Sequence, residues 1–191
     1  NGEGKTTLTK IINGEEPFTG DCQLGYNVKV GYYAQHQAEK LNGNMTVYDT
    51  VDHLAPHDMR PRLRNLLGSF LFGGNDVDKK VKVLSGGEKS RLALACLLLE
   101  PSNLLILDEP TNHLDMRSKD VLKEALLNYN GTLILVSHDR DFLQGLTNRT
   151  FYLRNQTIKE TIGDIQDFLS ALKIDSLQQL EIKQKKETPK A

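Results

Sequence analysis

Two stretches of the chain carry residues whose type and spacing suit phosphate chemistry. Ser85-Gly86-Gly87-Glu88 is a glycine turn that leads into an apolar helical stretch, where backbone N–H groups can meet a phosphate. Further along, the apolar run 104–107 ends in Asp108 and Glu109. Asp108 suits a magnesium ion, and Glu109 suits a proton acceptor that orients an attacking water. Together these stretches predict half of an ATP-hydrolysing site.

The N-terminal residues match the back end of the phosphate-binding loop G-x-x-x-x-G-K-[ST]. Lys5 would add a point charge between the β- and γ-phosphates, and Thr6 would offer a hydroxyl to Mg²⁺. The leading glycine of the motif would precede residue 1, so we expect the chain to begin inside its own nucleotide site as a piece of a longer protein. The candidate phosphate-binding residues are Asn1, Gly2, Gly4, Lys5, Thr6 and Thr7.

Three polar residues beside predicted strands have two interpretations each. The amide of Gln35 could touch the metal or the attacking water, or it could be an ordinary loop glutamine. His138 could donate to the γ-phosphate, or it could be a satisfied polar residue at the end of a strand. His113 is better interpreted as a loop residue that contacts its own backbone or a neighbouring subunit.

A chain with two anion-binding glycine turns also poses a question of geometry. The turn at Gly2 and Gly4 and the turn at Gly86 and Gly87 could converge on one nucleotide. Alternatively, they could act in trans, each completing the site of a partner.

The elements around these motifs alternate between helix and strand, which predicts an α/β fold with a mostly parallel sheet. Residues 104–107 and 132–137 are apolar runs typical of buried parallel strands. Residues 46–84 carry no strand signal and predict a helical subdomain, extending over about 46–99. The other expected elements are helices at 5–12, 47–54, 60–72, 85–99, 117–129, 142–146 and 164–172, a strand at 28–33, and a hairpin of 150–153 with 157–160.

Composition sets the remaining limits. The 191 residues carry a net charge of −1, so no global basic field indicates nucleic acid or a membrane surface. Cys22 and Cys96 lie far apart, and the apolar surroundings of Cys96 predict a buried free thiol of a reduced, cytoplasmic protein. No apolar run approaches the ~18 residues that span a bilayer, so we expect no direct membrane insertion.

The ordered motifs resemble those of an ABC-type ATPase domain, a P-loop NTPase fold whose helical subdomain carries the signature motif. The resemblance covers about residues 1–165, followed by a C-terminal helix and a Lys/Gln-rich tail at 166–191. It implies ATP and Mg²⁺ as cofactors, with Thr6, Gln35 and Asp108 at the metal and Glu109, His138 and Gln35 as catalytic residues. It also implies that Ser85, Gly86, Gly87 and Glu88 contact ATP bound by a second ABC domain.

Three segments are similar to the ABC-F subfamily. Residues 111–115 read Thr-Asn-His-Leu-Asp, where transporter ATPases usually have Ser-Ala-Leu-Asp, and residues 137–143 read Ser-His-Asp-Arg-Asp-Phe-Leu. Phe70-Leu71-Phe72-Gly73-Gly74 looks like the subfamily's second ATPase domain. The resemblance implies a two-domain protein that acts on the ribosome, with rRNA and tRNA as partners, or in antibiotic resistance. The alternatives are an ATPase subunit of a membrane transporter and a binding fragment without turnover, and we expect the isolated chain to be inactive.

Overall fold

The computed structural model describes residues 2–34, 37–112 and 114–174. These residues form two compact units, one comprising Gly4–Phe142 and the other comprising the residues on either side of that range. The predicted α/β class with a parallel sheet is confirmed in the larger unit, and the smaller unit holds a separate antiparallel hairpin.

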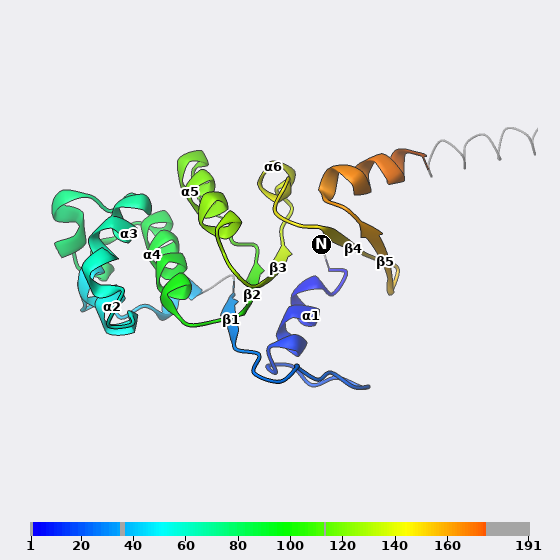
Figure 1. The fold of residues 1–191 in the computed structure, drawn as a ribbon, viewed down its shortest axis with the longest axis horizontal. Coiled ribbons are helices and arrows are strands. Elements are labelled where there is room, and N and C mark those ends of the chain that lie inside the picture. The colour runs from blue at the N-terminus through cyan, green and yellow to red at the C-terminus, as the bar shows by residue number, and fades with distance from the viewer. Residues whose placement is uncertain (1, 35–36, 113, 175–191) are drawn as a thin grey trace, which may run out of the picture. The chain divides into compact units, whose positions relative to one another are not determined.

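The larger unit is built on a parallel sheet in the order β1 (Val30–Tyr33), β2 (Leu104–Asp108), β3 (Thr132–Val136) (Figure 1). Every residue of β2 is buried, because this strand is central and is paired on both edges. The register pairs Tyr33 with Leu107 and Asp108 with Val136. Since the strands are parallel, their carboxyl ends lie at one edge of the sheet, where the residues that follow them can meet.

The expectation that 132–137 is a buried strand is only half right. The strand forms, but Thr132 is exposed and Leu133–Val136 are only half-buried. The physical reason is its position: among the described strands β3 pairs only with β2, so its other edge has no hydrogen-bonded neighbour. An apolar run predicts a strand that can be buried, and the neighbours decide whether it is.

Helices of the larger unit begin and end at local sequence signals. α1 (Lys5–Ile12) ends before Gly14, whose φ of 77° is the left-handed conformation predicted for a helix cap. α2 (Val47–Leu54) is capped by the hydroxyl of Thr46, which accepts the N–H of Asp49 at 3.0 Å. The remaining helices are α3 (Leu63–Ser69), α4 (Gly86–Leu99), α5 (Met116–Leu127) and α6 (Arg140–Leu143), with 3₁₀ turns at Gln37–Lys40, Arg60–Arg62, Gly74–Asp78 and Val81–Val83.

The described residues between 46 and 84 contain helices and 3₁₀ turns and no strand, apart from one isolated bridge between Thr46 and Lys80. The expected single helix at 60–72 is shorter than predicted. It begins with a 3₁₀ turn and ends at Ser69, and Leu71 then takes a φ of 65° that no helix can contain. The buried side chains of this helical segment are Val47, Thr50, Val51, Leu63, Leu67, Phe70, Phe72, Val77, Val81 and Leu84.

In the smaller unit, β4 (Arg149–Arg154) pairs with β5 (Thr157–Ile162) in an antiparallel hairpin. Its two-residue turn, Asn155 and Gln156, takes φ angles of 50° and 59°, the left-handed pair that suits a tight hairpin. Residues 165–174 are helical, and Phe168 packs on Tyr152 with ring centroids 5.1 Å apart. The predicted hairpin is therefore confirmed.

Candidate nucleotide site

The N-terminus of α1 is a ready anion site. Gly4, the cap residue, holds a φ of 87°, and Gly2 holds a φ of 81°, conformations that glycine adopts at little cost. No side chain caps the helix, and its first turn contains no acidic residue. The N–H groups of the first turn, which carry partial positive charge, are therefore available to a phosphate. Lys5 is half-buried there, and Thr6 and Thr7 are exposed.

At the carboxyl end of β2, the apolar strand carries Asp108 into the interior. The residue is only 2% exposed, and its Oδ1 atom is buried without a hydrogen-bond partner among the described residues. A buried carboxylate oxygen without a partner is costly, which is why such atoms usually meet a cation or a donor. Oxygen ligands of this kind are the ones that Mg²⁺ prefers. Asp108 is therefore suited to supply one oxygen ligand to a magnesium ion.

Glu109 follows with a left-handed backbone, at a φ of 51°. Its N–H donates to the carbonyl of Val136 at 2.8 Å, which carries the β2–β3 pairing one residue past the strand. A non-glycine residue in this conformation costs on the order of 1–3 kcal/mol, and such strain is concentrated at functional sites. The Oε1 atom of Glu109 is buried and has no hydrogen-bond partner within the described ranges.

His138 follows β3 and meets Glu109. Its Nε2 lies 3.5 Å from Glu109 Oε1, a distance that allows an ion pair when the imidazole is protonated but is long for a hydrogen bond. Ser137 holds the preceding turn: its Oγ accepts the N–H of Asp139 at 3.0 Å and lies 3.4 Å from Thr111 Oγ1. The structure thus brings together Glu109 and His138, two of the residues that the sequence singled out.

The signature turn forms a capping box at the start of α4. Ser85 donates to Glu88 Oε2 through both its N–H, at 2.8 Å, and its hydroxyl, at 2.7 Å. In return the N–H of Glu88 donates to Ser85 Oγ at 3.3 Å. The hydroxyl bond, followed by the backbone bond, holds the pKa of Glu88 below its ordinary value. Glu88 therefore orders the turn, and Ser85 and Gly86 are exposed while Gly87 is half-buried.

In Figure 1, the helices that follow the two glycine turns, α1 and α4, lie apart from each other. Within the larger unit, α4 lies beside α2 and α3, whereas α1 lies near β2 and β3, away from that helical group. Two residues predicted near the nucleotide, Asn1 and Gln35, lie outside the described residues, as does His113, which was interpreted as a loop residue.

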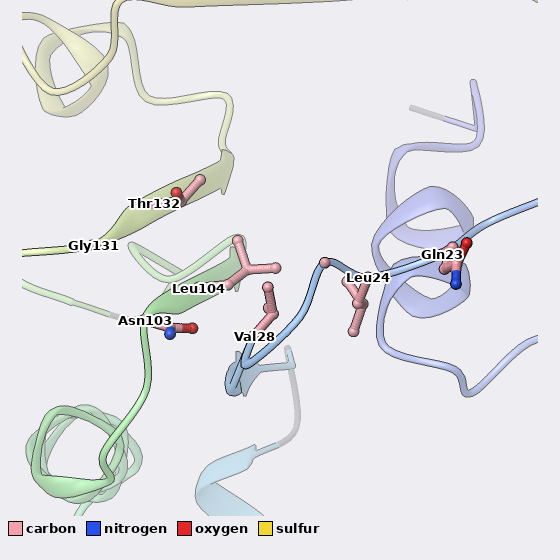
Figure 2. A pocket seen from close by; sticks show the side chains of 8 residues that line it. Gln23, Leu24, Val28, Asn103, Leu104, Gly131 and Thr132 are labelled. Atoms are coloured by element: carbon pink, nitrogen blue, oxygen red, sulfur yellow. The ribbon is translucent and has the colours of Figure 1, made fainter.

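A shallow pocket lies at the other end of the strands, as Figure 2 shows. Leu104 and Thr132, the first residues of β2 and β3, line it together with Val28 and Leu24. Gly131 also lines the pocket. A larger residue does not fit at this position, because its Cβ atom would stand 2.8 Å from the carbonyl oxygen of Asn103. The pocket is therefore separate from the candidate nucleotide site, which lies at the carboxyl ends of the strands.

Two positively charged side chains near the site were not predicted from the sequence. Arg91 of α4 is largely buried; its Nη1 donates to Ser118 Oγ at 3.2 Å and lies 3.7 Å from Asp115 Oδ2. Lys119 donates to Asp139 Oδ2 at 2.6 Å. The only sequence signal for them was a charge placed within a motif or on the polar face of a predicted helix, and that signal is common.

A family model described as ABC transporter matches residues 1–112 of the chain. The chain belongs to this family, whose domains bind ATP. YdiF of Bacillus subtilis (strain 168) is 47% identical over 191 residues, covering 100% of this chain and 29% of YdiF. ABC transporter F family member 5 of Arabidopsis thaliana is 44% identical over 171 residues, covering 88% of this chain and 25% of that protein. The predicted resemblance to the ABC-F subfamily is confirmed by these relatives, and the chain spans less than a third of their length.

Among solved structures, the chain resembles one described as the complex of the archaeal ribosomal stalk protein aP1 and the archaeal ribosome recycling factor aABCE1. The TM-score is 0.68 at 26% identity, covering 90% of this chain and 35% of the other. The expected ABC ATPase fold is thereby confirmed. Across residues 2–34, 37–112 and 114–174, no helix has the length and apolar character needed to cross a bilayer.

Proposed function

We propose that, as one half of a two-domain full-length protein, the chain binds Mg-ATP beyond the carboxyl ends of β2 and β3 and takes part in its hydrolysis. The observation that supports this most strongly is that Asp108 Oδ1 and Glu109 Oε1, on consecutive residues at the end of the central strand, are buried and have no hydrogen-bond partner among the described residues. Two buried acceptors without hydrogen bonds cost free energy in a protein that only needs to fold. They suit a site where one oxygen meets a cation and the other meets a water.

In this proposal, α1 and the carboxyl end of β2 bind Mg-ATP. The uncapped N–H groups of α1 and the side chain of Lys5 would hold the phosphates, while Thr6 and Asp108 would hold the magnesium ion. When bound, Mg²⁺ neutralises charge on the β- and γ-phosphates and orients them. Gln35, which lies outside the described residues, is proposed as a further ligand on that side.

Glu109 orients the attacking water and accepts its proton. Its position is suited to this role because the left-handed backbone and the N–H bond to Val136 fix where its side chain starts. His138, 3.5 Å from Glu109 Oε1, donates to the γ-phosphate. Because phosphoryl transfer depends mainly on positioning and electrostatics, a modest shift of either group would slow hydrolysis.

Ser85, Gly86 and Gly87 are proposed to act in trans, on ATP held by a second ABC domain. In support, Ser85 and Gly86 are exposed at the start of α4, and Figure 1 draws α4 away from α1. Two such domains in one full-length chain would each complete the other's site. In this proposal residues 1–165 form one ATPase domain, and 46–99 is the subdomain that carries the signature to its partner.

The cellular role that best suits the chain is action on the ribosome. The F-family relative and the similarity to a structure of an archaeal ribosome recycling factor support it. The net charge of −1 offers no support for RNA binding by this segment itself. Antibiotic resistance would be a narrower version of the same role, in which the protein protects the ribosome from an antibiotic.

The test of hydrolysis is Glu109→Gln in the full-length protein. ATP binding should persist while turnover falls by roughly 10²–10⁴, the usual contribution of a positioned acid–base group. Glu124→Gln, on the exposed face of α5, is the matched control and should keep normal turnover. Turnover of Glu109→Gln within threefold of wild type would remove Glu109 from the mechanism.

The ribosomal role has its own test. The Glu109→Gln protein, held with uncleaved ATP, should sediment with ribosomes, and the same protein with ADP should not. Equal sedimentation with ATP and ADP, or none with either, would contradict a nucleotide-controlled action on the ribosome.

A further inference from the structure

Two lysines of α5 donate hydrogen bonds to the segment that follows His138. Lys119 Nζ donates to Asp139 Oδ2 at 2.6 Å, and Lys123 Nζ donates to the carbonyl of Asp141 at 2.7 Å. The two lysines are four residues apart, so they project from one face of the helix, one turn from each other. The segment after β3 is therefore anchored on α5.

Asp139 has its other bonding groups engaged as well. Its Oδ1 accepts the N–H of Phe142 at 3.1 Å, and its own N–H donates to Ser137 Oγ at 3.0 Å. The backbone on both sides of His138 is thus held, while the His138 side chain is 58% exposed. An exposed side chain has little packing to fix it, so its distance from Glu109 depends on where its backbone is held.

The Lys119–Asp139 pair is suited to hold that backbone. The side chains are 28% and 21% exposed, so solvent screens the pair less than it screens an exposed ion pair. The distance of 2.6 Å is that of a short charge-assisted hydrogen bond. The Lys123 contact ends on a neutral carbonyl, two residues further from His138 than Asp139.

The first turn of the same helix, next to Lys119, also contacts the signature helix. Arg91 of α4 donates to Ser118, the residue next to Lys119, and lies 3.7 Å from Asp115, the cap of α5. A movement of α4 would therefore reach Lys119 through one helical turn.

We propose that Lys119 is a positioning residue for the ATPase reaction: by holding Asp139, it sets the distance between His138 Nε2 and Glu109 Oε1. The role of Lys119 rests on the hydrolysis proposed above.

The kinetic test compares three variants of the full-length protein. In Lys119→Met, the kcat for ATP hydrolysis should fall about 10- to 100-fold, as a displaced catalytic group would cause, with the KM for ATP within twofold of wild type. Lys119→Arg keeps a charge that reaches Asp139 and should recover most of the kcat. Lys123→Met removes the other anchor of the same segment and should keep kcat within threefold. Equal losses in Lys119→Met and Lys123→Met, or no recovery by Lys119→Arg, would overturn the proposal in favour of simple anchoring.

A second readout does not depend on turnover. The Hε1–Cε1 resonance of His138, assigned with His138→Ala, should shift in Lys119→Met and stay in place in Lys123→Met. Glu109→Gln should move this resonance in the wild-type background and much less in the Lys119→Met background. An unchanged resonance in Lys119→Met would overturn the positioning role. Normal turnover in Glu109→Gln would instead overturn the proposed hydrolytic mechanism, so the two failures are distinguishable.

Discussion

Glu109 and His138 come within 3.5 Å of each other, Oε1 to Nε2, although they follow different strands. The parallel register explains this contact, because Asp108 pairs with Val136 and the backbone leaves both strands at the same edge of the sheet. The N–H of Glu109 continues the pairing by donating to Val136. In the proposed mechanism a water would approach the carboxylate from beside this pair, with Glu109 as the proton acceptor and His138 as the donor to phosphate.

Lys5→Ala should weaken nucleotide binding itself. Lys5 would contact phosphate already in the ground state, so its loss acts on affinity before it acts on rate. A hydrogen bond to a charged group contributes about 1.5–3 kcal/mol, which corresponds to a rise in Kd of about 10-fold or more. Calorimetric titration of the full-length protein with Mg-ATP measures it. Lys10→Ala, on the same helix and paired with Glu16 at 3.6 Å, is the control and should bind normally.

Ser85→Arg should separate this domain's own site from that of its partner. The new side chain puts bulk and charge where the partner's γ-phosphate would dock. ATP binding at this domain's phosphate loop should survive, while domain closure and hydrolysis at the opposite site should fail. Ser85→Thr keeps a capping hydroxyl and serves as the control. Loss of binding at the domain's own loop, with closure preserved, would refute the assignment in trans.

Glu88→Ala should destabilise the start of α4. The variant removes the carboxylate that accepts both the N–H and the hydroxyl of Ser85. Loss of a helix cap costs about 0.5–2 kcal/mol, so the free energy of unfolding in urea should fall by that order. Glu88→Gln keeps an acceptor at the same place in the capping box and should lose less. Identical stability of Glu88→Ala and wild type would mean that the box contributes nothing.

The lowered pKa of Asp115 predicts that the free energy of unfolding depends on pH. Bonds from Ser118, its hydroxyl first and its N–H second, lower the pKa of Asp115 in the folded chain. A carboxylate whose folded pKa is depressed stabilises the fold above its unfolded pKa of about 3.9. That stabilisation is lost as the pH falls through the folded pKa.

The matched variant is Asp115→Asn, which keeps the capping acceptor but does not titrate. Urea unfolding of wild type and variant from pH 7 to pH 3 should show the wild type losing more stability below about pH 4. All other carboxylates are shared by the two proteins and cancel in the comparison. Parallel stability curves would rule out the contribution of Asp115.

The elements that the sequence predicted best are those set by nearby residues. α1 and α2 have the predicted bounds because Gly14 and Thr46 act within one turn of the helix end. The prediction that β3 is buried was wrong, because the burial of a strand depends on which strands lie beside it. The break at Leu71 was also missed, because Leu67, Phe70 and Leu71 all fit an apolar helical face.

The candidate site divides in the same way. Asp108, Glu109 and His138 could be singled out because each lies within two residues of the end of an apolar run, and parallel strands bring Glu109 and His138 close together. The contacts of Lys119 and Arg91 were not predictable, because they depend on how α5 is rotated against its neighbours. Sequence spacing gives the face of a helix, and only packing gives the partner on that face.

Burial of one cysteine has a practical consequence for labelling. The Cys96 thiol lies on α4 inside the larger unit, and burial raises its pKa to about 12, so it offers almost no thiolate at neutral pH. Cys22, the other thiol of the chain, is exposed. A maleimide dye would therefore attach at Cys22 of the unaltered chain, on the loop between α1 and β1. A fluorophore there would follow rearrangements of the phosphate-loop helix in real time without any engineered cysteine.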